Sequence, residues 1–209
     1  MKMSKVGYFS EFLVFPPLII IAMAFVVRDP VSHRPAVWVM TYLSGLVGWT
    51  LIEYLLHRVL FHQAPVLSQL HERHHRSPQD LIGTPAWVST LVGVLFVAGP
   101  SWTALGFGLG TTVTGGFVTG YLWYVLVHYA THHWQPPRGS YLYRARLRHA
   151  GHHHGCQEGN FGVTTNFWDY VFATVIRPLT LNQRVQGSSP CAPTTLILKE
   201  NLAQPESTN

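Results

Sequence analysis

Long runs without charge dominate the middle of the chain. The segment from Leu81 to Val127 contains no Asp, Glu, Lys or Arg. As one helix it would be roughly 70 Å long, more than twice the ~30 Å hydrocarbon core of a bilayer. The chain must therefore turn, and we expect the turn at Gly99-Pro100-Ser101, near the middle of the segment. The pattern predicts a helical hairpin that crosses the membrane and returns.

Two further apolar runs precede this hairpin. Ala36 to Leu56 is long enough to cross a bilayer and is interrupted only by Glu53. Phe12 to Val27 is shorter and needs residues from Val6 to Glu11 to reach across. Together these runs predict an all-α membrane protein with four transmembrane helices.

The first apolar run has two interpretations. Lys2 and Lys5 precede it, as basic residues precede the apolar part of a signal peptide. A cleavable signal would end in small residues, whereas Arg28-Asp29-Pro30 follows here. We therefore expect a retained membrane anchor.

The basic residues predict the orientation of these helices. Four spans place the N-terminus, residues 57–80 and everything after residue 128 on one side of the membrane. Of the 14 Lys and Arg residues, only Arg28 and Arg34 then fall on the other side. The excess of basic residues marks the cytoplasmic side. Every histidine except His33 shares that side, so we expect the functional site on the cytoplasmic face of a bacterial inner membrane or of the endoplasmic reticulum.

Composition supports this class. Apolar residues make up 47% of the 209 residues and charged residues 11%, against about 25% charged in soluble proteins. The net charge of +5 is spread thinly and suits a membrane surface better than a nucleic-acid groove, so no nucleic-acid partner is expected. We assign residues 1–180 to one integral membrane domain and residues 181–209, which are largely polar, to a C-terminal tail.

The candidate chemistry lies in the 13 histidines. Ten of them form spaced clusters, which are His57 and His62, then His71, His74 and His75, then His128 and His132, and finally His149, His152 and His153. Spacings of three and four residues bring imidazoles onto one helix face. His57 and His62 are five apart, about 140° around an α-helix, so we expect this pair to straddle a helix end. His33, His133 and His154 do not fit the spacing. A structural role is expected for His33, and His133 and His154 are expected to support the ligands from behind or to face solvent.

Ten imidazoles exceed the four ligands of one structural zinc, so the count predicts two metal ions with four or five ligands each. Imidazole suits iron, copper, zinc and nickel alike. Neutral ligands leave the metal charge uncompensated, and carboxylates are expected to hydrogen-bond the distal ring nitrogens. Glu53, four residues before His57 and near the end of an apolar run, is the first candidate; Asp169 and Glu72 are the others. An ion pair of Glu53 with Arg58 is the alternative.

A metal site at the mouth of an apolar bundle favours a substrate with a long hydrocarbon tail. Zinc would indicate hydrolysis, and His71-Glu72-Arg73-His74-His75 does match HExxH, but ten clustered histidines are more than that one-zinc motif uses. Two redox-active irons indicate dioxygen activation and attack on an unreactive C–H bond. A metal transporter or metal-storage membrane protein is the alternative from another class, and it would place polar ligands deep inside the spans. Since Leu81 to Val127 holds no histidine, the pattern favours the enzyme.

Four segments together resemble the fatty acid hydroxylase/sterol desaturase superfamily of membrane-bound di-iron oxygenases. They are EYLLHRVLFH, HERHHRSPQD, HYATHH, and LRHAGHHH followed by NFGVTTNFWDYVFAT. The resemblance runs from about Trp49 to Thr174. The HxxxxH spacing of the first segment and the Phe161-Gly162-Val163-Thr164 run are similar to the fatty acid (ceramide) 2-hydroxylase branch.

The resemblance implies that the ten clustered histidines bind two iron ions, which zinc can replace in purified protein. It implies four transmembrane helices under a cytosolic, histidine-rich helical cap, and a lipid acyl chain as substrate, hydroxylated with dioxygen beside the carbonyl carbon. Many members carry a cytochrome b5 domain with a His-Pro-Gly-Gly motif, which is absent here. Electrons are therefore expected from a separate cytochrome b5-type or ferredoxin-type donor. Carotenoid or sterol hydroxylation and desaturation remain alternatives within the superfamily.

Overall fold

The computed structural model describes residues 2–28, 34–155 and 158–176. All regular elements in these ranges are helices, and an isolated antiparallel bridge between Lys2 and Ile82 is the one β-type pairing among them. The predicted all-α class is confirmed. The predicted tail, residues 181–209, and His33 lie outside the described residues.

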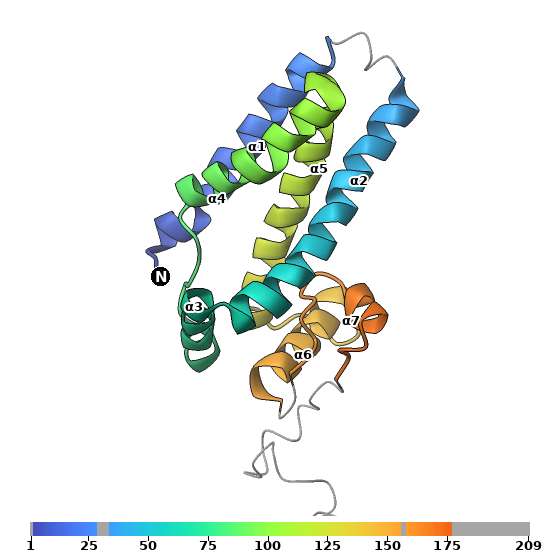
Figure 1. Ribbon diagram of the computed structural model, residues 1–209. Helices are drawn as coiled ribbons and strands as arrows, with labels where there is room; N and C mark the ends of the chain where they lie inside the picture. Colours follow the sequence, from blue (N-terminus) through green and yellow to red (C-terminus); the bar gives the residue numbers. More distant parts are fainter. Residues whose placement is uncertain (1, 29–33, 156–157, 177–209) are drawn as a thin grey trace, which may run out of the picture.

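The helices divide into a long bundle and a group at one of its ends (Figure 1). The bundle contains α1 (Lys5–Val26), α2 (Pro35–Leu55), α4 (Ala86–Gly93) and α5 (Gly99–His133). The group at its end contains α3 (Pro65–Arg76), α6 (Tyr141–His154) and α7 (Phe167–Val171). Two π-helical segments, η2 (Leu56–Phe61) and η3 (Val94–Ala98), extend α2 and join α4 to α5.

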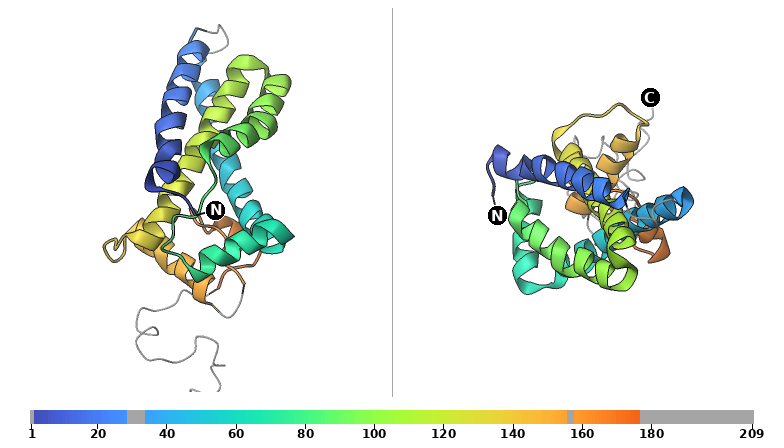
Figure 2. Two further views of the ribbon diagram at one scale, coloured as in Figure 1. Left: turned by 90° about the vertical axis from the view of Figure 1, so that its left-hand side faces the viewer. Right: turned by 90° about the horizontal axis from the view of Figure 1, so that it is seen from above.

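Among the described residues, three helical segments are long and apolar enough to cross a membrane: Lys5–Ala24, Pro35–Phe61 and Ala86–His133. The third folds back on itself, and its two arms run along the bundle beside α1 and α2 (Figures 1 and 2). The predicted hairpin is therefore present. The number of separate candidate spans is three rather than the four expected, because both arms belong to one continuous helical segment.

The turn of this hairpin lies at Gly106, and not at Gly99-Pro100-Ser101 as expected. Gly106 has φ 74° and ψ 170°, a conformation that glycine alone adopts readily. Pro100 instead sits in the first turn of α5, directly after η3, where a missing N–H group costs little. The arms are held together near the turn, since Trp102 Nε1 donates to Thr111 Oγ1 at 3.0 Å.

Glycines bring α2 and α5 into backbone contact. A Cβ atom on Gly45 would lie 2.0 Å from the carbonyl oxygen of Val113, and one on Gly116 would lie 2.0 Å from that of Tyr42. Such contacts are typical of membrane helices, whose packing relies on small residues at the interface. This close approach fixes the ends of α2 and α5, where the first and third histidine clusters lie.

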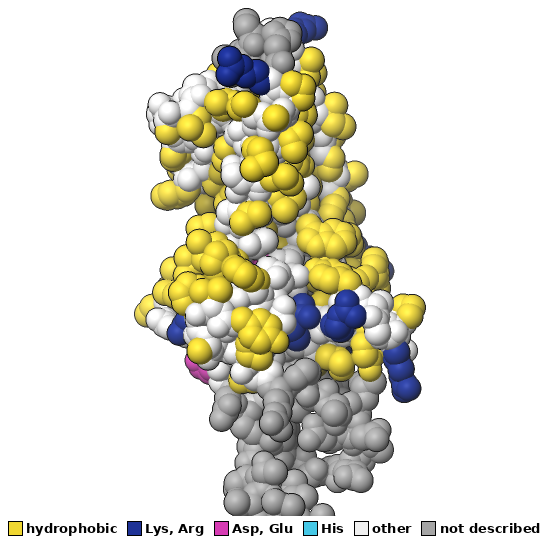
Figure 3. Space-filling view, turned by 90° about the vertical axis from the view of Figure 1, so that its right-hand side faces the viewer, with side chains coloured by type: hydrophobic (Ala, Val, Ile, Leu, Met, Phe, Trp, Pro, Cys, Tyr) yellow, Lys and Arg dark blue, Asp and Glu magenta, His cyan; other side chains and the backbone are white. Residues whose placement is uncertain are grey.

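The outside of the bundle is apolar. Leu13, Ile20, Met40 and Phe96 each have between 67% and 73% of their surface exposed. Figure 3 shows apolar side chains covering the long middle of the molecule, with Lys and Arg side chains at its upper end and around its lower part. This distribution suits a bundle surrounded by lipid, with its polar group of helices at a membrane surface.

Candidate metal centre

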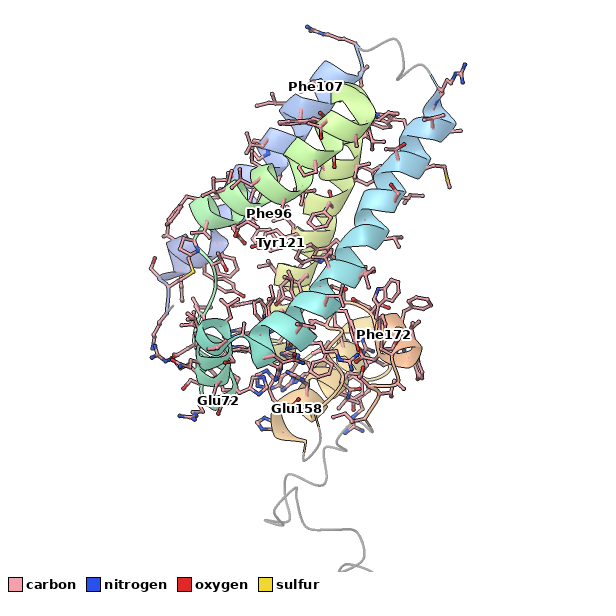
Figure 4. The ribbon with its side chains drawn as sticks, viewed as in Figure 1. Glu72, Phe96, Phe107, Tyr121, Glu158 and Phe172 are labelled. Carbon is pink, nitrogen blue, oxygen red and sulfur yellow. The ribbon has the colours of Figure 1, made fainter. Side chains whose placement is uncertain are left out.

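All ten predicted ligands converge into two groups of five. The first, called site A, contains His57, His62, His71, His75 and His152; the second, called site B, contains His74, His128, His132, His149 and His153. Within each group, one ring nitrogen of every member lies within 4.8 Å of those of the others. Figure 4 shows these nitrogen-bearing side chains gathered below α2, between α3 and α6. The sites adjoin, because His75 of site A stacks on His153 of site B with ring centroids 4.2 Å apart.

Each HxxHH cluster supplies both sites. On an α-helix, residues four apart are offset by about 40°, and residues three apart by about 60° in the opposite direction. In α3, His71 and His75 accordingly point to site A and His74 to site B. In α6, His149 and His153 point to site B, and His152 to site A. The histidines of one short helical segment can therefore bind two adjacent ions.

A π-helix brings the first pair together. His57 and His62 were expected to straddle a helix end, but η2 joins α2 to His62 without a break. Because hydrogen bonds in a π-helix link residues five apart, the HxxxxH spacing falls on one face. The two imidazole centroids are 5.4 Å apart, and both rings belong to site A.

The spacing of ring nitrogens fits metal coordination. In site A the Nε2 atoms of His57 and His71, and those of His71 and His75, are 3.0 Å apart. In site B the Nε2 atoms of His132 and His149 are 2.9 Å apart. Two nitrogens bound at about 2.0–2.1 Å and at right angles around one ion would lie about 3 Å apart. The chemistry and the geometry of both sites therefore suit an imidazole-bound transition metal.

The electrostatic environment keeps these ligands neutral. Burial, followed by the neighbouring histidines, lowers the pKa of His74 and His75 to about 4. The same causes lower the pKa of His152 to about 3 and hold that of His149 well below its ordinary value. Since only a neutral imidazole binds a metal, the rings are ready to coordinate at pH 7.

Two buried carboxylates stabilise the loop of residues 159–165 next to site A. Glu53 accepts hydrogen bonds from the backbone N–H groups of Val163 at 2.7 Å and Thr164 at 2.9 Å, and from the Thr164 hydroxyl. Asp169 accepts from the N–H groups of Phe161 at 2.8 Å and Gly162 at 2.9 Å. These contacts replace the direct carboxylate–imidazole bonds expected from the sequence. They also replace the Glu53–Arg58 ion pair, because the Arg58 guanidinium donates instead to the hydroxyl of Tyr54 at 2.9 Å.

The loop carbonyls are the functional groups that sequence reasoning missed. The Phe161 carbonyl accepts from His57 Nδ1 at 2.6 Å, and the Gly159 carbonyl accepts from His152 Nδ1 at 2.9 Å. Each bond leaves the Nε2 atom of its ring turned to site A. The signal in the sequence was the glycine-containing run after the last cluster, but a backbone oxygen leaves no residue-type signature.

The remaining candidates are not among the ten converging side chains. Glu72 is exposed and pairs with Arg76 at 3.0 Å. His133 stacks on Tyr129 and belongs to neither group, nor does His154. On the bundle side, the Tyr124 ring stacks on His128 with centroids 5.6 Å apart, so the apolar interior reaches site B directly.

Comparisons with known proteins agree with this geometry. A sequence profile of the family described as "Fatty acid hydroxylase" matches residues 42–174. The fatty acid 2-hydroxylase of Homo sapiens is 36% identical over 146 residues, covering 64% of this chain and 39% of that protein. The dihydroceramide fatty acyl 2-hydroxylase FAH2 of Arabidopsis thaliana is 36% identical over 148 residues, covering 63% of this chain and 58% of that protein.

A solved structure is also similar. It is described as full-length scs7p with only the hydroxylase domain visible, and it superposes with a TM-score of 0.72 at 25% identity, covering 83% of this chain and 69% of that one. The chain spans about two fifths of the length of the mammalian relatives it matches. The resemblance inferred from the histidine clusters is confirmed, and the chain belongs to the fatty acid hydroxylase family.

Proposed function

We propose that this chain is a membrane-bound di-iron hydroxylase that inserts one oxygen atom from dioxygen into a lipid acyl chain. The observation that carries the proposal is the convergence of ten neutral imidazoles into two adjoining sites at the end of an apolar bundle. The names of the relatives, fatty acid 2-hydroxylase and dihydroceramide fatty acyl 2-hydroxylase, favour the carbon beside the carbonyl as the position attacked.

The chain's own residues bind and orient the metal. His57, His62, His71, His75 and His152 would hold one iron, and His74, His128, His132, His149 and His153 the other. When bound, the two irons supply the activation of dioxygen and the cleavage of the C–H bond. The products are an alcohol and water, so each turnover consumes two electrons and two protons. We assign the electrons to a separate cytochrome b5-type or ferredoxin-type protein.

The apolar bundle provides the route for the substrate. Trp49 packs against Tyr124, with centroids 5.8 Å apart, and Tyr124 packs against His128 of site B. An acyl chain arriving through the bundle would meet these aromatic rings immediately before the metal sites. Apolar walls exclude water there, which protects a reactive oxidising centre from side reactions.

The arrangement in the membrane follows from the same features. We propose that the two arms of Ala86–His133 cross separately, which gives four crossings in total with α1 and α2. The helices α3, α6 and α7 then form a cap on the cytoplasmic face. The proposal rests on the basic residues. Arg28 follows α1 and Arg34 precedes α2, at the end of the bundle opposite α3 and α6 (Figure 1). Other Lys and Arg side chains surround the lower part of the molecule in Figure 3.

Lipid profiling tests this function. Cells that express the chain should accumulate acyl chains heavier by one oxygen atom, with the hydroxyl group beside the carbonyl. His71→Ala should abolish the product while the protein remains in the membrane, because site A loses a ligand. His133→Ala is the matched control, since this histidine belongs to neither site, and it should retain product formation. New oxygen on carotenoids or sterols alone would reassign the substrate, and unchanged hydroxylation in His71→Ala would refute the ligand assignment.

A further inference from the structure

The two metal sites differ in how the far nitrogens of their histidines are bound. In site A, His57 Nδ1 and His152 Nδ1 donate to backbone carbonyls at 2.6 and 2.9 Å. In site B, the Nδ1 atoms of His74, His149 and His153 are buried and have no hydrogen-bond partner among the described residues. Site A has no such buried, unpaired ring nitrogen among those residues. Both sites have five histidines, but only in site A do hydrogen bonds from buried Nδ1 atoms fix the orientation of the rings among the described residues.

The contact behind His57 extends to a carboxylate through a single peptide group. The Phe161 carbonyl accepts from His57 Nδ1, and the N–H of the same peptide, that of Gly162, donates to Asp169 Oδ2 at 2.9 Å. Hydrogen bonds in series polarise one another, so the charge of Asp169 strengthens the acceptor that His57 meets. A carboxylate behind a histidine ligand raises the basicity of the ligand and fixes its orientation.

The geometry of the loop depends on this peptide. A Cβ atom on Gly162 would lie 2.0 Å from the Thr165 carbonyl oxygen and 2.8 Å from Asp169 Oδ2, so only glycine lets the carboxylate approach the backbone this closely. Asp169 is itself held in place, because the Thr174 hydroxyl donates to its Oδ1 at 2.8 Å. Its side chain is fully buried, with 0% of its surface exposed. The carboxylate therefore acts at a fixed distance from site A.

Other negative charges also lie on the side of site A. Glu72 and Glu158 are both exposed and lie in the lower part of the molecule in Figure 4. Both carboxylates are close enough to His62 of site A for their charges to act on it. Two divalent ions bound by ten neutral rings carry four positive charges. The carboxylates that can compensate those charges, Asp169, Glu72 and Glu158, lie on the side of site A.

We propose that the two sites retain their ions unequally, with site A holding its ion firmly and site B exchanging it, and that Asp169 is a positioning residue for site A through the Phe161–Gly162 peptide. This inference rests on the proposed dimetal function. It adds an order to metal loading, because site A fills first. It also assigns loss of the site B ion as the first step by which the protein becomes inactive when metal is scarce.

Release of zinc from the full chain in detergent tests the inequality. Zinc is a suitable probe because it binds imidazole and has no redox chemistry. Protein loaded with two ions is challenged with excess chelator, and the zinc retained per chain is measured over time. We expect two phases of about one ion each, with rates that differ tenfold or more. Release of both ions at one rate would overturn the proposal.

Ligand variants identify which phase belongs to which site. His153→Ala removes a ligand of site B and should leave only the slow phase. His71→Ala removes a ligand of site A and should leave only the fast phase. The reverse pattern would mean that site B is the firmer site.

Carboxylate variants test the route through the peptide. Asp169→Asn should accelerate the slow phase by about 10-fold to 100-fold and leave the fast phase unchanged. Glu53→Gln is the matched control, because Glu53 is buried next to the same loop but binds the N–H groups of Val163 and Thr164. Its effect should be smaller, and equal effects of the two variants would refute the assigned route. Circular dichroism checks folding, and the two histidine variants decide the inequality if Asp169→Asn does not fold.

Zinc release tests the unequal retention, and lipid hydroxylation separately tests the proposed function. A chain that releases zinc in the two expected phases but forms no hydroxylated lipid would refute the proposed function alone. A chain that forms hydroxylated lipid but loses both ions at one rate would refute the unequal retention alone.

Discussion

Glu53 lies in an apolar helix but has a structural role, because it holds the loop of residues 159–165. Its side chain has 3% of its surface exposed and accepts the backbone N–H groups of Val163 and Thr164. A buried N–H group left without an acceptor costs about 1–3 kcal/mol. The carboxylate therefore fixes the loop that contacts the ligands of site A.

Replacement of Glu53 tests this role. Glu53→Leu should lower the free energy of unfolding by roughly 2–6 kcal/mol, since two buried backbone N–H groups lose their acceptor, and should lower the metal content of site A. Glu53→Gln keeps one acceptor oxygen and should be milder. Thermal unfolding in detergent and metal analysis of both variants provide the comparison. If Glu53→Leu is as stable as Glu53→Gln, the hydrogen bonds to the loop contribute little.

At this scale the sequence predicts the ligands but not their partners. Spacings of three, four and five residues were enough to select all ten histidines that converge. Their division between two sites required the helix geometry, and the carbonyl acceptors of Phe161 and Gly159 required the loop conformation. Imidazoles have a residue-type signature, whereas a backbone carbonyl is present at every position.

At the scale of the elements, α2 and α5 pack backbone against backbone. Gly45 permits it, since its Cβ would meet the Val113 carbonyl at 2.0 Å, whereas a Cβ on Gly48 has nothing within 4 Å. Both glycines lie in α2, three residues apart. They form a matched pair for substitution.

Gly45→Ala should separate α2 from α5 and destabilise the protein by about 1–3 kcal/mol, as overpacking does. Gly48→Ala should be neutral or stabilising by up to ~1 kcal/mol, because alanine favours helix more than glycine does. Unfolding in detergent measures both. Equal stability of the two variants would show that the helices can move apart without cost.

A buried polar contact attaches α1 to the same bundle. The Tyr121 hydroxyl donates to Glu11 Oε1 at 2.6 Å, and Ser89 Oγ lies 3.1 Å from that hydroxyl. Glu11 has 3% of its surface exposed. Residues on three helices thus share one hydrogen-bonded group inside the apolar bundle.

Tyr121→Phe should cost about 1.5–3 kcal/mol of stability, because a buried carboxyl loses its donor. Tyr42→Phe is the control, since its hydroxyl donates at 2.7 Å to the neutral Thr119 hydroxyl, and its loss should cost nearer to 0.6 kcal/mol. Thermal unfolding of the two variants ranks the contacts. A larger loss for Tyr42→Phe would contradict the importance of the Glu11 contact.

Two features of the elements were not predictable from apolar patterning. The π-helix at Leu56–Phe61 depends on backbone hydrogen bonds to residues five positions away, which no residue type encodes. The turn at Gly106 competes with many glycines in the same run, and Gly99-Pro100 carried the stronger turn signal. A proline that begins a helix and a proline that ends one look alike in sequence.

For the whole molecule, the apolar pattern predicted the class and the hairpin, and the comparisons confirmed the family. Orientation stays a prediction, because it rests on the distribution of basic residues. Val27 is exposed at the end of the bundle that carries Arg28, and Gln135 is exposed beside the histidines, between α5 and α6. Cysteines at these two positions would report opposite sides of the membrane.

In a chain whose Cys156 and Cys191 are replaced by serine, Val27→Cys should react with a membrane-impermeant thiol reagent in intact cells. Gln135→Cys should react only after the membrane is opened, because the positive-inside rule places its loop in the cytoplasm. Lipid product formation checks that each variant is folded. Reaction of Gln135→Cys in intact cells would reverse the orientation.

If two irons held by ten histidines oxidise a lipid acyl chain, the oxygen of the new hydroxyl group must come from dioxygen. The iron-loaded protein, in membranes with an electron donor, is therefore supplied with isotopically heavy dioxygen, and the mass of the acyl chains is measured. We predict that one heavy oxygen atom enters the acyl chain in the wild-type protein and none in His128→Ala. Hydroxyl oxygen derived from water, or a protein that carries two irons and leaves every lipid unchanged, would contradict the account.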